Sequence, residues 1–130
     1  RYVYSNANPT DYVGQWVHVV GTKDVNGIMK IYLNGVKDKE RDWGAFTFRK
    51  RANTLVGYSY GYFNGIISSV SVYKDQALSP SDIRKLYEGR KLPTDFDSCV
   101  LWLPFYLGDA MDRSGYGNHG INYGAIYSIS

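Results

Sequence analysis

The sequence predicts an all-β fold, a sandwich of antiparallel strands with one short helix near residues 79–88. Among its 130 residues are 13 Tyr and 14 Gly, and aromatic residues favour pleated strands while glycine favours turns. Asn-Gly pairs occur at 26–27, 34–35 and 64–65, and this dipeptide is typical of tight hairpin turns. With 44% hydrophobic and 21% charged residues, the chain has the composition of one folded domain.

The first expected strands form consecutive hairpins. Residues 15–22 and 28–33 are dense in β-branched and aromatic residues, and Asn26-Gly27 lies between them. A second turn at Asn34-Gly35 sends the chain back toward Val36. Three consecutive antiparallel strands are therefore expected before the polar stretch that follows.

Further strands are expected in the middle of the chain. Segments 45–48 and 54–58 have strand composition, and residues 66–73 mix apolar and small polar positions after the third Asn-Gly pair. This mixture is typical of a half-buried strand.

One helix is predicted to begin at Ser79. A serine cap, Pro80 at the first helical position and Asp82 in the first turn all favour a helix start, and Gly89 favours its end. The apolar stripe that should face inward comprises Ile83, Leu86 and Tyr87.

Beyond the helix, residues 89–98 have linker composition and residues 99–105 read as an apolar strand. Pro104 within that strand indicates an edge position or a bulge. A glycine-rich turn over 108–120 leads to a last expected strand, residues 121–129.

Three large or sulfur-bearing residues are expected inside the fold. Trp16 and Trp102 lie in apolar strands, which favours a core position for both. Cys99 is the single cysteine and cannot form an internal disulfide, so we expect it to act as a buried hydrophobic residue.

Several segments together resemble the laminin-G-like, concanavalin A-like lectin/glucanase superfamily. They are Trp16-Val-His-Val-Val, Met29-Lys-Ile-Tyr-Leu-Asn-Gly, Leu55-Val-Gly, Tyr62-Phe-Asn-Gly-Ile and the ending from Val72 to Tyr87. The resemblance implies the second half of an antiparallel jelly-roll sandwich and its closing helix. Ser68 and Ser71 depart from the pattern, because many relatives carry an acidic and a basic residue there.

A second resemblance covers Val100–Phe105 and Asp112–Gly120, which look like the opening of a domain of the same family. The order therefore reads as back half (1–88), linker (89–98) and front segment (99–130). Two arrangements stay open. Residues 99–130 complete the same sandwich in permuted order, or they pair with a neighbouring molecule, since an unpaired sheet edge is a template for another strand.

Charge and hydropathy exclude some partner classes. The net charge is +3 and the basic residues are scattered among acidic ones, apart from local runs such as Arg49-Lys50-Arg51, so we expect no nucleic-acid partner. No apolar stretch approaches the length of a membrane span, so we expect no membrane insertion. The resemblance implies an extracellular, cell-surface or virion-surface protein.

Catalytic groups are not expected. Retaining glucanases carry two carboxylates about 5 Å apart on one strand, and no expected strand has such a pair. Glu40 and Glu88 are the only glutamates, one in a charged loop and one at a helix end, and the aspartates lie in turns. His18 and His119 have no neighbour in sequence that would orient them toward a nucleophile. A degenerate glycoside hydrolase is a distant alternative.

One turn has the composition of a calcium site. Asp109, Asp112 and Asn118 bring oxygen-bearing side chains to the same glycine-rich turn, and calcium accepts such ligands. The alternative is structural, because Asp and Asn in such turns usually bond their own backbone.

The candidate glycan site is aromatic. Tyr58, Tyr60 and Tyr62 alternate in a glycine-rich turn, and Trp43 is a further candidate; the alternative is that these rings cover the sandwich edge or a neighbouring subunit. We expect a lectin-like module in adhesion or carbohydrate binding, with a glycan or neighbouring copies as partners. The alternative is a structural subunit of a filament or surface assembly, joined by strand exchange through residues 99–130.

Overall fold

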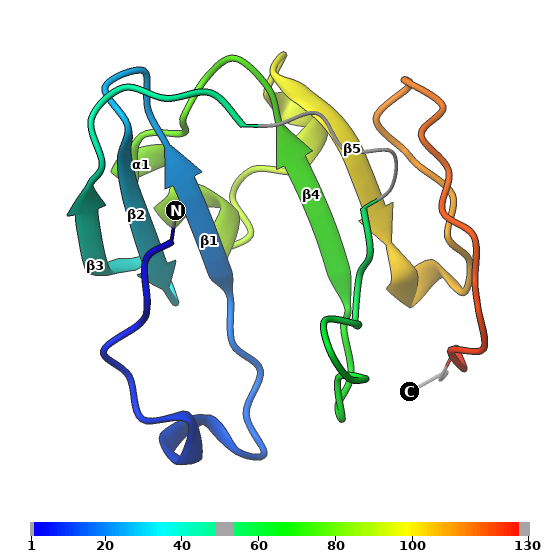
Figure 1. Cartoon of the computed structure of the whole chain (residues 1–130). Helices are drawn as coiled ribbons and strands as arrows, with labels where there is room; N and C mark the ends of the chain where they lie inside the picture. The colour runs from blue at the N-terminus through cyan, green and yellow to red at the C-terminus, as the bar shows by residue number, and fades with distance from the viewer. Residues whose placement is uncertain (1, 49–53, 128–130) are drawn as a thin grey trace.

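The computed structural model describes residues 2–48 and 54–127, which form two antiparallel sheets and one α-helix (Figure 1). The three-stranded sheet has the order β1-β2-β3 and the other sheet pairs β4 with β5. This confirms the predicted all-β fold. The elements are β1 (Val19–Lys23), β2 (Ile28–Leu33), β3 (Val36–Asp42), β4 (Ser69–Tyr73), α1 (Pro80–Tyr87) and β5 (Cys99–Pro104), with 3₁₀ turns at Pro9–Tyr12, Pro93–Asp95 and Phe105–Leu107.

The predicted hairpin turn between β2 and β3 is confirmed. Asn34 and Gly35 both have positive φ angles, 50° and 80°, as the tight turns of hairpins require. The Asn34 amide donates to the His18 carbonyl over 2.8 Å, and the Asn34 side chain accepts from the His18 amide over 2.9 Å. The turn is thereby tied to the residue that precedes β1.

β3 is longer than the sequence indicated. The polar stretch expected to follow the third strand belongs to β3, which pairs with β2 from Leu33↔Val36 to Ile28↔Asp42. Charged side chains suit this position, because β3 is an edge strand and its side chains are mostly exposed.

Other expected strands are absent from the described residues. Segments 45–48 and 54–58 contain no strand, apart from an isolated bridge between Tyr58 and Tyr62, and residues 121–127 contain none either. These predictions were wrong because strand composition alone does not determine whether a segment pairs in a sheet. Residues 49–53, which include the basic run, and residues 128–130 lie outside the described part.

The predicted helix is confirmed at its start and its end. The Ser79 hydroxyl accepts from the Asp82 amide over 3.1 Å, and Pro80 is the first helical residue. Gly89, just after the helix, has a φ of 72°, and its amide donates to the Leu86 carbonyl over 3.1 Å.

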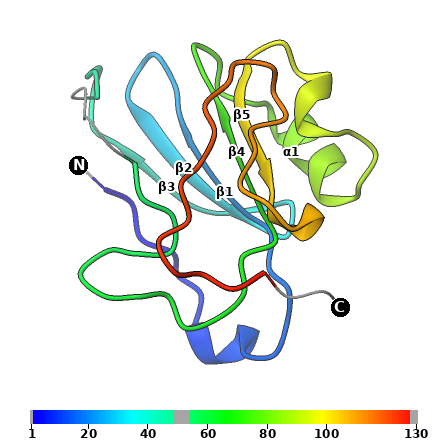
Figure 2. The same ribbon diagram turned by 90° about the vertical axis from the view of Figure 1, so that its right-hand side faces the viewer.

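The helix links the two sheets. Ile83 of α1 is fully buried and packs with Tyr32 of β2 and with Leu78. Figures 1 and 2 show α1 on one side of both sheets, behind β1 in the first view. The partly buried residues around this cluster come from both sheets, from the helix and from the segment before β5: Val20, Tyr73, Leu86 and Phe96.

β5 pairs with β4 of the same chain, from Ser69↔Pro104 to Tyr73↔Cys99. The register shifts between Val72 and Tyr73, so the irregularity lies away from Pro104, which ends the strand at its edge. The division of the chain at residues 88 and 98 stays a prediction.

The three residues that were expected in the core have different positions in the structure. Cys99 is buried and is a free thiol, as expected. Trp102 is half-buried, and its ring N–H donates to the Ser69 hydroxyl over 3.2 Å. Trp16 was wrongly placed in the core, because it lies before β1 begins and is 67% exposed.

Across the described residues, no helix has both the length and the apolar character that a bilayer crossing demands.

Candidate functional site

The tyrosine loop, residues 57–63, is closed by its own backbone. The Phe63 amide donates to the Gly57 carbonyl over 2.8 Å, and the Ser59 amide donates to the Gly61 carbonyl over 3.0 Å. Tyr60 lies at the tip with a left-handed φ of 57°. These bonds place Tyr58 and Tyr62 opposite each other across the loop.

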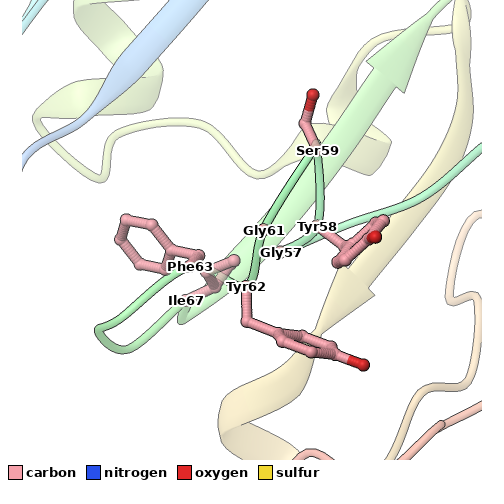
Figure 3. A pocket seen from close by; sticks show the side chains of 7 residues that line it. All are labelled: Gly57, Tyr58, Ser59, Gly61, Tyr62, Phe63 and Ile67. Carbon is pink, nitrogen blue, oxygen red and sulfur yellow. The ribbon is translucent and has the colours of Figure 1, made fainter.

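A shallow hollow of about 480 Å³ lies against this loop. Figure 3 shows Tyr58 and Tyr62 projecting to one side of the loop and Phe63 to the other. The two tyrosine ring centres are 5.0 Å apart with an interplanar angle of 60°, and Tyr62 is 87% exposed. The lining residues are Gly57, Tyr58, Ser59, Gly61, Tyr62, Phe63 and Ile67.

The structure thus brings two of the four predicted glycan-binding residues together. Tyr58 and Tyr62 share the hollow, whereas Tyr60 is fully exposed at the tip and is not part of the lining. Trp43 belongs to a different group of rings, with Tyr2.

Trp43 contacts both the N-terminal segment and β3. Its ring N–H donates to the Tyr2 carbonyl over 2.9 Å, and the Arg41 guanidinium lies 4.0 Å from its ring centre. A cation stacked on the indole face covers surface that a sugar would need. The sequence reasoning missed Arg41, although it lies two residues before Trp43 near the end of the edge strand β3, a spacing that places side chains of extended backbone on one face.

The Asp112 loop, residues 109–120, is organised around one carboxylate. Asp112 is only 6% exposed, and it accepts four hydrogen bonds of 2.8–2.9 Å. The donors are the amides of Trp102, Ser114 and Asn118 and the Ser114 hydroxyl. The carboxylate therefore fastens the loop to β5.

The hydrogen bonds set the charge of this carboxylate. Burial alone would raise the pKa of Asp112, but the amides of Trp102, Ser114 and Asn118 and the Ser114 hydroxyl outweigh it and lower the pKa to about 2. For Asp109, the hydrogen bond from the Met111 amide is the main cause that lowers its pKa, and the Arg113 side chain adds to it.

The three residues proposed for calcium are each engaged in protein contacts. Both Asp112 oxygens accept protein donors, Asp109 accepts from Met111 and Arg113, and the Asn118 side chain donates to the Val100 carbonyl over 3.0 Å. The described ranges contain no group of three or more His, Cys, Asp or Glu side chains that could hold a metal ion. Calcium binding here stays a prediction.

The comparison with protein families shows to which family the chain belongs. A model of the laminin G type, described as the concanavalin A-like lectin/glucanases superfamily, matches residues 1–84. The chain belongs to this superfamily. No curated protein and no solved structure gives a significant match. The matched range includes the tyrosine loop and ends before the Asp112 loop.

Membership of the lectin/glucanase superfamily supports a lectin-like or adhesion-type module as the general class. The superfamily also contains glycosidases, so the acidic residues matter. Glu40 pairs with Lys37, and Glu88 pairs with Arg84 and Arg90 over 2.8 Å each. Each glutamate is thus held by cations on its own element or next to it.

The hollow against the tyrosine loop is also lined by residues that were not among the predicted glycan-binding residues. Phe63 and Ile67 supply apolar wall, and Ser59 supplies a hydroxyl. Phe63 directly follows Tyr62 in the glycine-rich run, so the aromatic density of this run was the available signal. The sequence reasoning also missed His119 as a partner of Asp112. The Asp112 amide donates to Nδ1 of His119 over 2.9 Å.

Proposed function

We propose that this chain is a non-enzymatic, lectin-like module that binds a neutral glycan at the tyrosine hollow. The observation that carries the proposal is the exposed pair Tyr58 and Tyr62, held 5.0 Å apart beside a hollow by the backbone of the loop. The family supports the general class, and the hollow supplies the candidate site.

The chemistry of the lining favours a sugar ring. Aromatic faces pack against the C–H groups of a pyranose, while the tyrosine hydroxyls and the Ser59 hydroxyl offer hydrogen bonds at the rim. Tyrosine suits this role because its ring is apolar, its tip is polar and few torsions are frozen on binding.

The charge of the lining favours a neutral glycan. All seven lining residues are uncharged, so a sulfate or carboxylate on the sugar would lose its hydration there without gaining a cation. Sialylated and sulfated glycans are therefore expected to bind less well than neutral ones.

The absence of enzymatic activity is part of the proposal. Each glutamate is occupied by cations, and the aspartates of the Asp112 loop serve its backbone. Adhesion at a cell or virion surface is the setting that fits a lectin-like module, and we propose it with the binding activity.

The test is a glycan array followed by titration calorimetry on the full chain. Tyr62→Ala and Tyr58→Ala remove one face of the pair each, and Tyr116→Ala removes an exposed tyrosine from the Asp112 loop as a matched control. Loss of one stacking face should weaken binding about tenfold, equivalent to ~1.4 kcal/mol.

The proposal predicts retained binding of neutral glycans by Tyr116→Ala and weakened binding by the two hollow variants. Equal affinity in all four proteins would place the glycan elsewhere and overturn the assigned site. Failure of the array to detect any glycan would overturn the binding function itself.

A further inference from the structure

The chain exposes far more surface than a closed domain of its mass. Its accessible surface is 10,014 Å² at 14.7 kDa, whereas a compact monomer of this mass exposes about 6,900 Å². The excess of about 3,000 Å² is several times the roughly 800 Å² that each partner contributes to a standard protein interface. Surface of this extent is available for another polypeptide to cover.

Among the described strands, two of the four outer sheet edges are protected. β3 carries charged side chains along most of its length, a common device against edge pairing. The outer edge of β5 is occupied by the Asp112 loop: the Trp102 amide donates to Asp112, the Trp102 carbonyl accepts from the Arg113 amide over 2.8 Å, and Asn118 donates to the Val100 carbonyl.

The edge of β1 is open. His18 and Asp24 make ladder hydrogen bonds to the β2 side of the hairpin, so the alternation of an antiparallel ladder turns the amides and carbonyls of Val19, Gly21 and Lys23 away from β2. Across residues 2–48 and 54–127, no strand pairs with this edge.

The edge of β4 is the counterpart. β4 pairs only with β5 among the described strands. Figure 1 shows β1 and β4 running in the same direction as the facing margins of the two sheets. Val20 of β1 and Tyr73 of β4 pack on the same core cluster. One extended segment, antiparallel to both, would join the two sheets above this cluster.

The chain itself carries a segment suited to that position. Residues 121–127 read as a strand in the sequence, yet the structure gives them no strand partner. Ile121 and Tyr123 are 75% and 84% exposed and alternate with Asn122 and Gly124. In an extended conformation this alternation would present one apolar face.

We propose that residues 121–127 of a second copy insert as a strand between β1 and β4. The inserted segment must have both of its backbone edges unpaired, so a strand that already pairs within a folded sheet cannot take this position. Seven extended residues span about 23 Å, enough to cover the roughly 17 Å of a five-residue strand. Reciprocal exchange gives a dimer, and non-reciprocal exchange gives a filament.

A local turn within residues 121–127 competes with the insertion of this segment as a strand. The Asn122 side chain accepts from the amides of Gly124 and Ala125 over 3.0 and 2.7 Å, and it donates to the Ala125 carbonyl over 2.8 Å. The segment must open this turn before it pairs. Asn122→Ala, which removes all three bonds, should therefore raise the share of assembled protein.

The experiment measures the solution mass of the full chain by light scattering over a concentration series. An acceptor variant, Gly21→Lys, charges the open edge at a position where a new Cβ meets no atom within 4 Å. A donor variant combines Ile121→Lys and Tyr123→Lys. Val25→Lys charges an equally exposed apolar residue in the β1–β2 turn as a control.

We expect the wild type and Val25→Lys to form dimers or larger assemblies. The acceptor and donor variants should be monomeric and should keep the circular dichroism spectrum of the wild type. Mixing the two monomeric variants should restore a 1:1 complex, because the mixture holds one intact donor and one intact acceptor. A monomeric wild type at every concentration, assemblies that persist in both variants, or no complex on mixing would each overturn the proposal.

Discussion

At the scale of single residues, the Asp112 carboxylate fastens the Asp112 loop to β5. It is buried, and its four hydrogen bonds join β5 to the loop that covers its edge. Asp112→Asn replaces one carboxylate oxygen with an N–H donor, so two of the four donors lose their acceptor whichever way the amide faces. We expect it to cost ~2 kcal/mol of the free energy of unfolding at neutral pH, measured by urea denaturation.

The pKa of Asp112 also predicts a pH dependence. The folded value of about 2 lies below the ordinary 3.8, so the ionised carboxylate stabilises the fold above about pH 4 and this contribution is lost as the pH falls toward 2. The loss should be on the order of 2 kcal/mol and should be missing from Asp112→Asn. The exposed Asp97→Asn serves as a control, and an unchanged acid response of Asp112→Asn would contradict the assignment.

Single residues also show a limit of sequence reasoning. Asp112 was selected for its oxygen atoms, and its turn composition already indicated the alternative that the structure displays, a carboxylate that bonds backbone amides. Trp16 was misjudged because apolar neighbours in the sequence say nothing about whether another element covers the ring.

At the scale of elements, the β2–β3 turn and the helix are coupled. A Cβ added to Gly35 would lie 3.1 Å from the Tyr87 ring of α1, and Gly35 has a φ of 80°. Gly35→Ala therefore combines backbone strain with a tight contact that the Tyr87 ring must relieve by a small shift, and we expect it to lower the free energy of unfolding by about 2 kcal/mol.

Gly14→Ala separates the two causes. Gly14 has a similar φ of 76°, but a Cβ there meets no atom within 4 Å. Its cost should be about 1 kcal/mol, from backbone strain alone. Equal melting temperatures for the two variants in thermal denaturation would show that the contact between the turn and α1 contributes nothing.

Elements with local signals were predictable, and elements that depend on a partner were not. The Asn34-Gly35 turn and the Ser79 cap are fixed by backbone angles and hydrogen bonds within a few residues. By contrast, β3 pairs with β2 despite its charged sequence. Segments 45–48 and 54–58 have strand composition but form no strand among the described residues, because pairing is decided by neighbours distant in the sequence.

At the scale of the whole molecule, one helix holds two small sheets whose unprotected edges face each other (Figure 1). The family was recognisable from the order of turns and strands, since that order survives divergence of individual residues. The tyrosine hollow was only partly predictable. Alternating tyrosines indicated Tyr58 and Tyr62, but which of the four candidate rings share a surface depends on how the loop closes.

We propose that the tyrosine hollow of this lectin-like module receives a neutral sugar. Saturation-transfer NMR of the full chain with a mixture of neutral oligosaccharides tests it most directly. Because the aromatic pair should lie against the C–H face of a bound ring, saturation should reach ring protons on one face of the sugar and should fall sharply in Tyr62→Ala. Equal transfer in the wild type and Tyr62→Ala, or no transfer in either, would contradict the account.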